Sequence, residues 1–527
     1  TFTDQNNVLA SISTAGGSGG GSITIEHGGG GNTPFIVGDA AVNGTAGAIT
    51  SGNSIILPFQ SFRGSTTVGN IRIITPSDQN LSCDLADCEI EDDLEEDLLT
   101  FAEDSSLDLK PESEARAALQ RIQEATGVKP ALIYLSFVPI GGSAAQALQT
   151  NEQRFSNQIA QHLGKPTDGV PIAIAPSDAD QLEVLLVTAT GNPVLKRVPV
   201  TRREILQVAR QFRNEVSSPF KTQTTSYLAS AQQLYNWIVR PLEVELQAQK
   251  IQNLNFIMET GLRFIPLAAL HDGNSFLIDQ YSLGLMPSLS LVDTRYVDVR
   301  NAQALLGGTS TFADLSPLPA VPTELAIISQ IWSPGAKSFE KDSFTPTQLK
   351  LARQEQPFGI VHLATHGEFV PGDLSQSFIQ FNNTRLQLDQ LRSLGFNQPP
   401  VELIVLSACK MALGSDEAEL GFAGFALQSG AKSVLASLWS VSDEGTLALM
   451  TGFYEALRRA PIKAEALRQA QQALSNRQIN VKDGKLIYSN AAGTASFDLP
   501  ENLQTLGTRN LAHPYYWAAF TLLGSPW

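Results

Sequence analysis

A cysteine and a histidine each follow a run of apolar residues in the second half of the chain. His366 comes after GIVHLAT (359–365), and Cys409 comes after ELIVLSA (402–408). A thiol becomes a strong nucleophile when a neighbouring imidazole favours its thiolate form. The two residues therefore predict a cysteine nucleophile, Cys409, beside a histidine base, His366.

Such a pair also needs hydrogen-bond donors, because acyl transfer places negative charge on an oxygen atom. His366 is followed by Gly367, and a glycine lets the backbone approach a substrate carbonyl with no side chain in the way. We therefore expect the backbone N–H groups of Gly367 and Cys409 to form an oxyanion hole.

Each of these residues also has a structural interpretation. A lone cysteine is most often a small buried residue of the core, and a lone histidine is often an ordinary loop residue. The pairing favours chemistry, because His366 and Cys409 both follow predicted strands in neighbouring strand–helix units. His362 lies inside its strand, and we expect it to be buried and hydrogen-bonded rather than catalytic.

Other chemistries find little support in the sequence. No pair of histidines with Asp or Glu has the spacing of a metal site, and no phosphate-binding glycine pattern follows a strand, so we expect no metal and no cofactor. The net charge of −16 argues against nucleic acid as a main partner, because phosphate binding needs clustered Lys and Arg. No uncharged apolar run reaches 18 residues, so no membrane span is expected.

Apolar strands and amphipathic helices alternate after residue 112. Strands are predicted at 131–138, 182–188, 254–258, 359–365, 403–407 and 433–438. Helices are predicted at 112–126, 202–213, 226–247, 323–331, 421–430, 445–459 and 463–476. This alternation is typical of an α/β fold whose mostly parallel sheet is covered by helices on both faces. Sites in such sheets form at the carboxyl ends of the strands, where His366 and Cys409 both fall.

The front of the chain has a different composition. Residues 1–75 are rich in Gly, Ser, Thr and Asn, with short β-prone runs that predict stacked β rungs or a small sheet, and a flexible linker is the alternative. This segment resembles the end of a filamentous haemagglutinin-type β-helix in composition. Residues 76–112 are predicted to be a solvated linker, because Asp84 to Asp104 holds eleven acidic residues and no basic one.

Compartment and processing leave weaker traces. The chain starts at Thr1 without a signal peptide, so we expect a fragment or a processed product. Cys83 and Cys88 are either free thiols or a disulfide in an oxidising compartment. The glycine-rich front slightly favours a secreted or cell-surface protein over a cytoplasmic one.

Five phrases along the chain resemble the CHAT domain. They are ETGLRFIPLAALHDGNSFLIDQYSL (259–283), VHLATHGEF (361–369), LIVLSACKMALG (403–414), GFAGFALQSGAKSVLASLWSVSDEGT (421–446) and HPYYWAAFTLLG (513–524). CHAT domains are caspase-like modules related to separase. The resemblance implies a pseudo-caspase half at 113–304 and an active caspase-like half at 305–527. It also implies peptide-bond hydrolysis through a thioester, with Cys409 as the nucleophile and His366 as the acid and base.

An acidic pair follows the last predicted strand of the active half. Resemblance to separase and to gingipain-like enzymes implies that Asp443 and Glu444 bind a basic P1 side chain. The alternative for Asp443 is an N-cap of the helix that begins near Gly445, and one residue can serve both roles. Trp439 is expected either in the wall of this pocket or in the core.

Two departures from the family affect specificity. Lys410 and Met411 stand where family members often carry Glu-Thr, and the segment 139–180 is longer than a compact sheet unit needs.

Three functions remain open from the sequence. The first is a regulated cysteine endopeptidase that acts on a protein or peptide and responds to an activating protein partner. The second is a catalytically silent scaffold that serves as an adhesin-type or protein-interaction module. The third is self-processing near the acidic linker, with Lys110 and Arg116 as candidate P1 residues.

Overall fold

The structure is a computed structural model, and it describes a defined part of the chain. The described residues are 2–3, 9–13, 22–26, 35–37, 44–45, 48–51, 54–56, 61–62, 66–68, 71–74, 112–139, 177–368, 377–407, 430–440, 442–490, 493–504 and 510–527. Several predictions lie outside them, namely those for Cys409, Cys83, Cys88, Lys110 and the helix at 421–430. The chain divides into two compact units, Thr1–Asp104 and Ser105–Trp527, and the boundary falls in the acidic segment.

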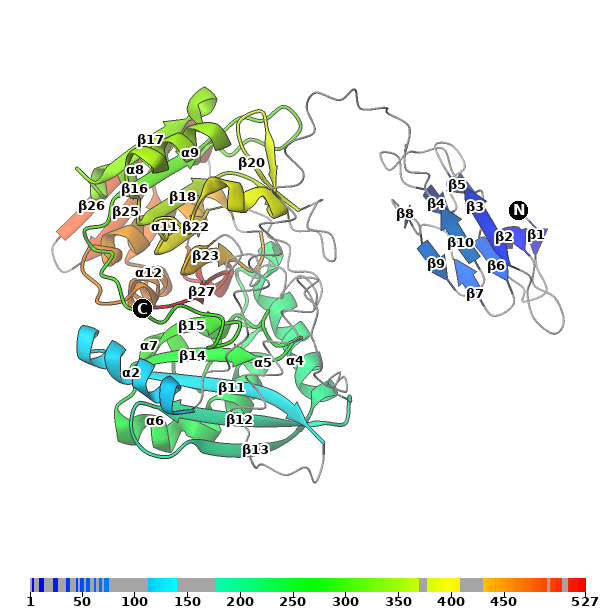
Figure 1. Cartoon of the computed structure of the whole chain (residues 1–527), viewed down its shortest axis with the longest axis horizontal. Helices are drawn as coiled ribbons and strands as arrows, with labels where there is room; N and C mark the ends of the chain where they lie inside the picture. The colour runs from blue at the N-terminus through cyan, green and yellow to red at the C-terminus, as the bar shows by residue number, and fades with distance from the viewer. Residues whose placement is uncertain are drawn as a thin grey trace. The chain divides into compact units, whose positions relative to one another are not determined.

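The first unit consists of short strands in its described residues (Figure 1). These are β1 (Phe2–Thr3), β2 (Leu9–Ser13), β3 (Ile23–Glu26), β4 (Phe35–Val37), β5 (Gly44–Thr45), β6 (Ala48–Ser51), β7 (Ser54–Ile56), β8 (Ser61–Phe62), β9 (Thr66–Val68) and β10 (Ile71–Ile74). They pair as β1-β2-β6-β7, β3-β10-β9 and β5-β4-β8, and a small core of Ile and Val lies among them. The expected β-rich segment is present, and the haemagglutinin-type resemblance stays a prediction.

The second unit is built on one long sheet. Its strand order is β13-β12-β11-β14-β15-β27-β23-β22-β18-β16-β17. The bounds, in that order, are Val194–Thr201, Gln181–Thr188, Pro130–Val138, Asn253–Met258, Ser282–Met286, Phe520–Gly524, Ser433–Ser437, Leu403–Leu406, Ile360–Ala364, Ala304–Gly308 and Ala336–Glu340. Seven of the ten neighbouring pairs are parallel, which confirms the expected mostly parallel sheet.

Helices flank this sheet (Figure 1). The α-helices of the described residues are α2 (Glu112–Thr126), α4 (Arg202–Val216), α5 (Leu228–Ile238), α6 (Glu243–Gln249), α7 (Leu277–Gln280), α8 (Val321–Ile331), α9 (Pro346–Glu355), α11 (Asp443–Leu457), α12 (Lys463–Ser475), α13 (Glu501–Gln504) and α14 (Pro514–Trp517). The 3₁₀ helices are η1 (Pro219–Lys221), η2 (Arg240–Leu242), η3 (Leu267–Ala269), η4 (Lys341–Ser343) and η5 (Leu388–Leu394). Helices α8 and α11 pack against each other beside the strands that precede the site.

Two small antiparallel sheets complete the second unit. One consists of β19 (Gly367–Glu368), β20 (Phe378–Gln380) and β21 (Arg385–Gln387). The other consists of β24 (Ile479–Lys482), β25 (Lys485–Asn490) and β26 (Gly493–Asp498).

The single helix predicted at 226–247 is wrong. The chain forms α5, then η2, then α6, and Pro241 lies in the middle of η2. Proline has no backbone N–H and its ring collides with the preceding turn, so it breaks an α-helix.

The long sheet has two halves that follow the order of the chain. Strands β11 to β15 form one half, and β16, β17, β18, β22 and β23 form the other. The last strand, β27, returns between them: it runs parallel to β15 and antiparallel to β23. The carboxyl ends of β18 and β22 are neighbours, because these strands are parallel and in register at Leu363 and Leu406.

Candidate active site

His366 lies two residues past the end of β18, where a long loop covers it. Its Nε2 lies 2.7 Å from the carbonyl oxygen of Ser316, and the ring of Phe312 packs edge-on against the imidazole with 4.6 Å between centroids. A carbonyl oxygen only accepts hydrogen bonds, so in the neutral imidazole Nε2 carries the proton and Nδ1 keeps its lone pair. The role of His366 as a base stays a prediction. Sequence reasoning missed both loop residues.

The backbone beside His366 is held by a small sheet. Gly367 is buried and opens β19, which pairs with β20 in the register Gly367 to Ile379. The N–H of Gln380 donates to the carbonyl oxygen of His366 at 2.8 Å. Gly367 is therefore fixed next to the imidazole, and its role as an oxyanion donor stays a prediction.

The approach to Cys409 can be followed as far as Ser407. The N–H of Ser407 donates to the carbonyl oxygen of Leu363 at 3.0 Å, which extends the pairing of β22 with β18. The chain thus leaves both strands at one edge of the sheet, toward His366 in one case and toward Cys409 in the other. Cys409 lies outside the described residues, so its distance to His366 stays untested.

Asp443 and Glu444 are the first two residues of α11. The N-cap is Ser442, whose Oγ accepts from the N–H of Gly445 at 3.3 Å, so the interpretation of Asp443 as the N-cap is wrong by one position. Oδ2 of Asp443 accepts a 3.4 Å hydrogen bond from the N–H of Ala320, the residue before α8. Its carboxyl group therefore lies where the N-termini of α8 and α11 meet, while the side chain of Glu444 is buried beside it.

The environment of Asp443 opposes its ionisation. The pKa of Asp443 is raised to about 6, mainly by burial and in smaller part by the nearby carboxylates of Glu324 and Glu444, while the hydrogen bond from Ala320 lowers it. The described residues place no lysine or arginine within ion-pair distance of Asp443. A partly buried carboxyl group without a cation of its own is suited to receive one from a ligand.

Three buried polar side chains are linked by hydrogen bonds between β18, α8 and α11. Nε2 of His362 lies 2.9 Å from Oε1 of Glu324, and Nδ1 of His362 lies 3.1 Å from the hydroxyl of Tyr454. All three side chains are almost fully buried. The expectation of a buried, hydrogen-bonded His362 is confirmed, whereas its two partners were missed. Glu324 was visible in principle, because it is the single charged residue of the α8 sequence VPTELAIISQI.

Family comparison gives this geometry a context. The CHAT domain family matches residues 228–525, which is more than half of the chain. The chain belongs to the CHAT domain family. The sequence resemblance is thereby confirmed, and the family supports a caspase-like cysteine peptidase fold for the second unit. No curated protein matches the chain.

Solved structures resemble the CHAT protein only distantly. The separase–securin complex of Saccharomyces cerevisiae has 12% sequence identity and a TM-score of 0.42, with 79% of the present chain and 31% of that chain covered. The Arg-specific cysteine proteinase gingipain R has 10% identity and a TM-score of 0.34, with coverage of 62% and 74%. The complex of the pro- and mature domains of RgpB from Porphyromonas gingivalis has 10% identity and a TM-score of 0.32, with coverage of 62% and 76%. The CHAT protein thus spans less than a third of the separase chain.

Trp439 belongs to the core of the CHAT domain. Its indole is buried, and its Nε1 donates to the carbonyl oxygen of Tyr515 at 3.2 Å. This satisfies its one polar group, so the core interpretation describes Trp439 better than a pocket wall.

Metal and membrane features can be assessed in the same described ranges. There, no cluster of three or more His, Cys, Asp or Glu side chains is arranged to hold a metal ion. Nor does any described helix have the length and apolar character needed to cross a membrane.

Proposed function

We propose that the CHAT domain is a cysteine endopeptidase with His366 and Cys409 as its catalytic dyad. The observation that carries the proposal is the hydrogen bond from Nε2 of His366 to the carbonyl oxygen of Ser316. A histidine held in one tautomer, with Nδ1 ready to accept a proton, is what a thiol nucleophile requires. Phe312 adds a packing contact that limits rotation of the ring.

The proposed reaction has two steps. In acylation, Nδ1 of His366 takes the thiol proton, the sulfur of Cys409 attacks the peptide carbonyl, and the proton passes to the leaving amine as the C–N bond breaks. In deacylation, His366 takes a proton from water, the resulting hydroxide attacks the thioester carbon, and the C–S bond breaks as the leaving thiolate takes the proton back from His366. The N–H groups of Gly367 and Cys409 stabilise the oxyanion in both steps.

Asp443 is proposed to select a basic P1 residue, with Glu444 next to it. Its carboxyl group lies at two helix N-termini and has no lysine or arginine partner in the described residues. A lysine or arginine side chain would form a charge-assisted hydrogen bond with it. The substrate class is therefore a protein or peptide with Lys or Arg at P1, and an activating protein partner remains part of the proposal.

Self-processing at Arg116 is disfavoured. Arg116 lies inside α2, and its guanidinium donates to the carbonyl oxygen of Gly191 in the folded domain. A peptidase binds its substrate in an extended form, so cleavage there would require α2 to unfold. Lys110 lies outside the described residues and remains a candidate.

Peptide cleavage tests the dyad most directly. We expect the wild type to cleave fluorogenic peptides with Arg or Lys at P1, in preference to Asp or Leu. Cys409→Ala and His366→Ala should each reduce kcat/KM by about 10³-fold or more, because dyad members act as a unit. Cys83→Ala is the matched control, because it removes a thiol far from the dyad in sequence.

Thiol labelling separates an enzyme from a scaffold. In the proposed enzyme, iodoacetamide labels Cys409 at pH values below the usual thiol range, and His366→Ala suppresses this reactivity. If the wild type cleaves no peptide and Cys409 reacts like an ordinary thiol in both proteins, the scaffold function replaces the peptidase.

A further inference from the structure

Three carboxyl groups meet where α8 and α11 begin. Asp443 contacts the start of α8 through the N–H of Ala320, and the carbonyl oxygen of Ala320 accepts from the N–H of Glu324 at 2.9 Å, so Glu324 lies one helical turn from this contact. Glu324 and Glu444 are buried. Like charges disfavour each other's ionised form, and the carboxylates of Glu324 and Glu444 both raise the pKa of Asp443.

His362 is the hydrogen-bond partner of Glu324. Its Nε2 lies 2.9 Å from Oε1 of Glu324, and both side chains are buried. An ionised Glu324 can only accept, so Nε2 is the donor in this contact. Glu324 is therefore the carboxylate that has an imidazole partner, while among the described residues Asp443 has a long hydrogen bond from the backbone N–H of Ala320.

Tyr454 completes the arrangement from α11. Its hydroxyl lies 3.1 Å from Nδ1 of His362, and burial raises the pKa of Tyr454 well above its usual value, so the hydroxyl keeps its proton. A protonated hydroxyl can donate to Nδ1 and hold the imidazole in the tautomer that donates to Glu324. Tyr454 of α11 thus donates to His362 of β18, and His362 donates to Glu324 of α8, so the two hydrogen bonds point the same way and connect the three elements.

We propose that Glu324, His362 and Tyr454 are positioning residues that set the charge on Asp443, and thereby the pH range in which the site accepts a basic side chain. This rests on the proposed function, in which Asp443 binds the P1 residue. The charged groups that face Asp443 in the described residues are Glu444 on its own helix and Glu324 on α8, with His362 on β18 acting through Glu324. The carboxylate of Glu324 adds to the effect of burial in raising the pKa of Asp443, so this arrangement shifts basic recognition toward neutral and alkaline pH.

Glu324→Gln is the decisive variant. It removes one negative neighbour of Asp443, so Asp443 should ionise at lower pH. The readout is the ratio of kcat/KM for an Arg-P1 peptide to that for a Leu-P1 peptide, measured from pH 5 to pH 8, because the dyad affects both substrates equally. We expect the fall of this ratio on the acid side to move down by about half a pH unit to one pH unit.

Two further variants accompany Glu324→Gln. Tyr454→Phe keeps every carboxyl group but removes the hydroxyl that orients His362, so the pH midpoint of the ratio should move by less than in Glu324→Gln. Glu243→Gln changes a partly buried glutamate of α6, outside the site, and should leave the midpoint unchanged. An unchanged midpoint in a folded, active Glu324→Gln protein would overturn the inference.

A stability measurement decides the inference even without activity. Melting temperatures of the wild type, Glu324→Gln, Asp443→Asn and the double variant form a double-mutant cycle at pH 5 and pH 8. We expect the two substitutions to be coupled at pH 8, where Asp443 is charged, and nearly additive at pH 5, where Asp443 is mostly protonated. Additivity at both pH values would refute the coupling. Failure of all peptide cleavage would remove the proposed function alone.

Discussion

Asp272 and Asp443 belong to different halves of the second unit, and the hydrogen-bond donors and charges around their carboxylates differ. Asp272 follows η3, and its carboxylate accepts from the backbone N–H groups of Asn274 at 2.6 Å and Ser275 at 2.8 Å and from the side chain of Gln280 at 2.8 Å. Burial alone would raise the pKa of Asp272, but these hydrogen bonds lower it overall. Within the part of the chain that the structure describes, Asp443 accepts one hydrogen bond, of 3.4 Å, and its pKa is raised.

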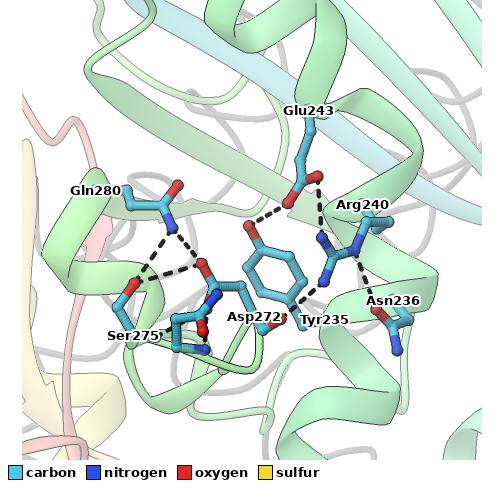
Figure 2. Close-up of polar contacts among 8 residues, drawn as sticks. Tyr235, Asn236, Arg240, Glu243, Asp272, Ser275 and Gln280 are labelled. Atoms are coloured by element: carbon cyan, nitrogen blue, oxygen red, sulfur yellow. Dashed lines mark hydrogen bonds and ion pairs between the residues drawn. The ribbon is translucent and has the colours of Figure 1, made fainter.

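Hydrogen bonds link Asp272 to a network of polar and charged side chains (Figure 2). Arg240 donates to Glu243 at 3.2 Å, to Asn236 at 3.1 Å and to the carbonyl oxygen of Asp272 at 2.8 Å. The hydroxyl of Tyr235 donates to Glu243 at 2.8 Å, so it ties α5 to α6. These contacts hold together the three short segments that replace the predicted long helix and the loop that follows η3.

This difference indicates different roles for the two aspartates. Every oxygen of the Asp272 carboxylate has a donor, as expected for a group that stabilises a turn. Among the described residues, Asp443 has one long hydrogen bond from a backbone N–H, and the carboxylates of Glu324 and Glu444 oppose its ionisation. A group kept in such surroundings is a candidate for binding, because a ligand can supply the missing interaction.

The largest expected difference between Asp443 and Asp272 is in peptide selectivity. Asp443→Asn should reduce the ratio of kcat/KM for Arg-P1 over Leu-P1 peptides by about 100-fold, because truncating one partner of a buried charge pair removes roughly 2–5 kcal/mol. Asp272→Asn is the control and should leave the ratio unchanged. Equal ratios in the wild type and Asp443→Asn would place the P1 pocket elsewhere.

The free energy of unfolding should depend on Asp272, in contrast to peptide selectivity, which should depend on Asp443. Asp272→Ala leaves the N–H groups of Asn274 and Ser275 without their acceptor, so we expect the free energy of unfolding to fall by about 2 kcal/mol. Urea unfolding at pH 7.5 measures this loss. The variant should keep its peptide selectivity once folded, and a selectivity change as large as that of Asp443→Asn would contradict the division of roles.

The sequence predicts local features of this fold well. The expected helix at 112–126 has the bounds of α2, because its apolar residues recur at helical spacing after Pro111. The strands before His366 and Cys409 appear as β18 and β22, since near-continuous apolar runs are typical of buried parallel strands. The α/β class follows from the same signals, whereas the CHAT family follows from the five phrases that resemble it.

Long-range contacts were beyond sequence reasoning. Asp443 meets Ala320 across 123 positions, and His366 meets Ser316 across 50. Such pairings depend on how α8 and its preceding loop pack on the sheet, and no local periodicity encodes them. The N-cap assignment failed for a local reason, because Ser442 and Asp443 are both good caps and the sequence does not rank them.

The smallest expected effect is on the pH dependence of the free energy of unfolding, which should have opposite signs for Asp443 and Asp272. The Asp443 carboxyl titrates near 3.8 when exposed and at about 6 in the folded protein, so between these pH values the folded state binds more protons than the unfolded state. The free energy of unfolding therefore falls as the pH rises through this window. Asp443→Asn removes that loss, and we expect it to stabilise the protein by roughly 1–2 kcal/mol at pH 8, after a discount for partial solvent screening.

The same variant should give no gain at pH 4, where Asp443 is already protonated in the folded state. Asp272 has the opposite sign, because a lowered pKa adds stability above the unfolded value and loses it as the pH falls through the folded value. Urea titrations of both asparagine variants at pH 4 and pH 8 measure the contrast. If Asp443→Asn destabilises the protein at pH 8 as Asp272→Asn does, both aspartates serve the fold, and the basic pocket loses its main support.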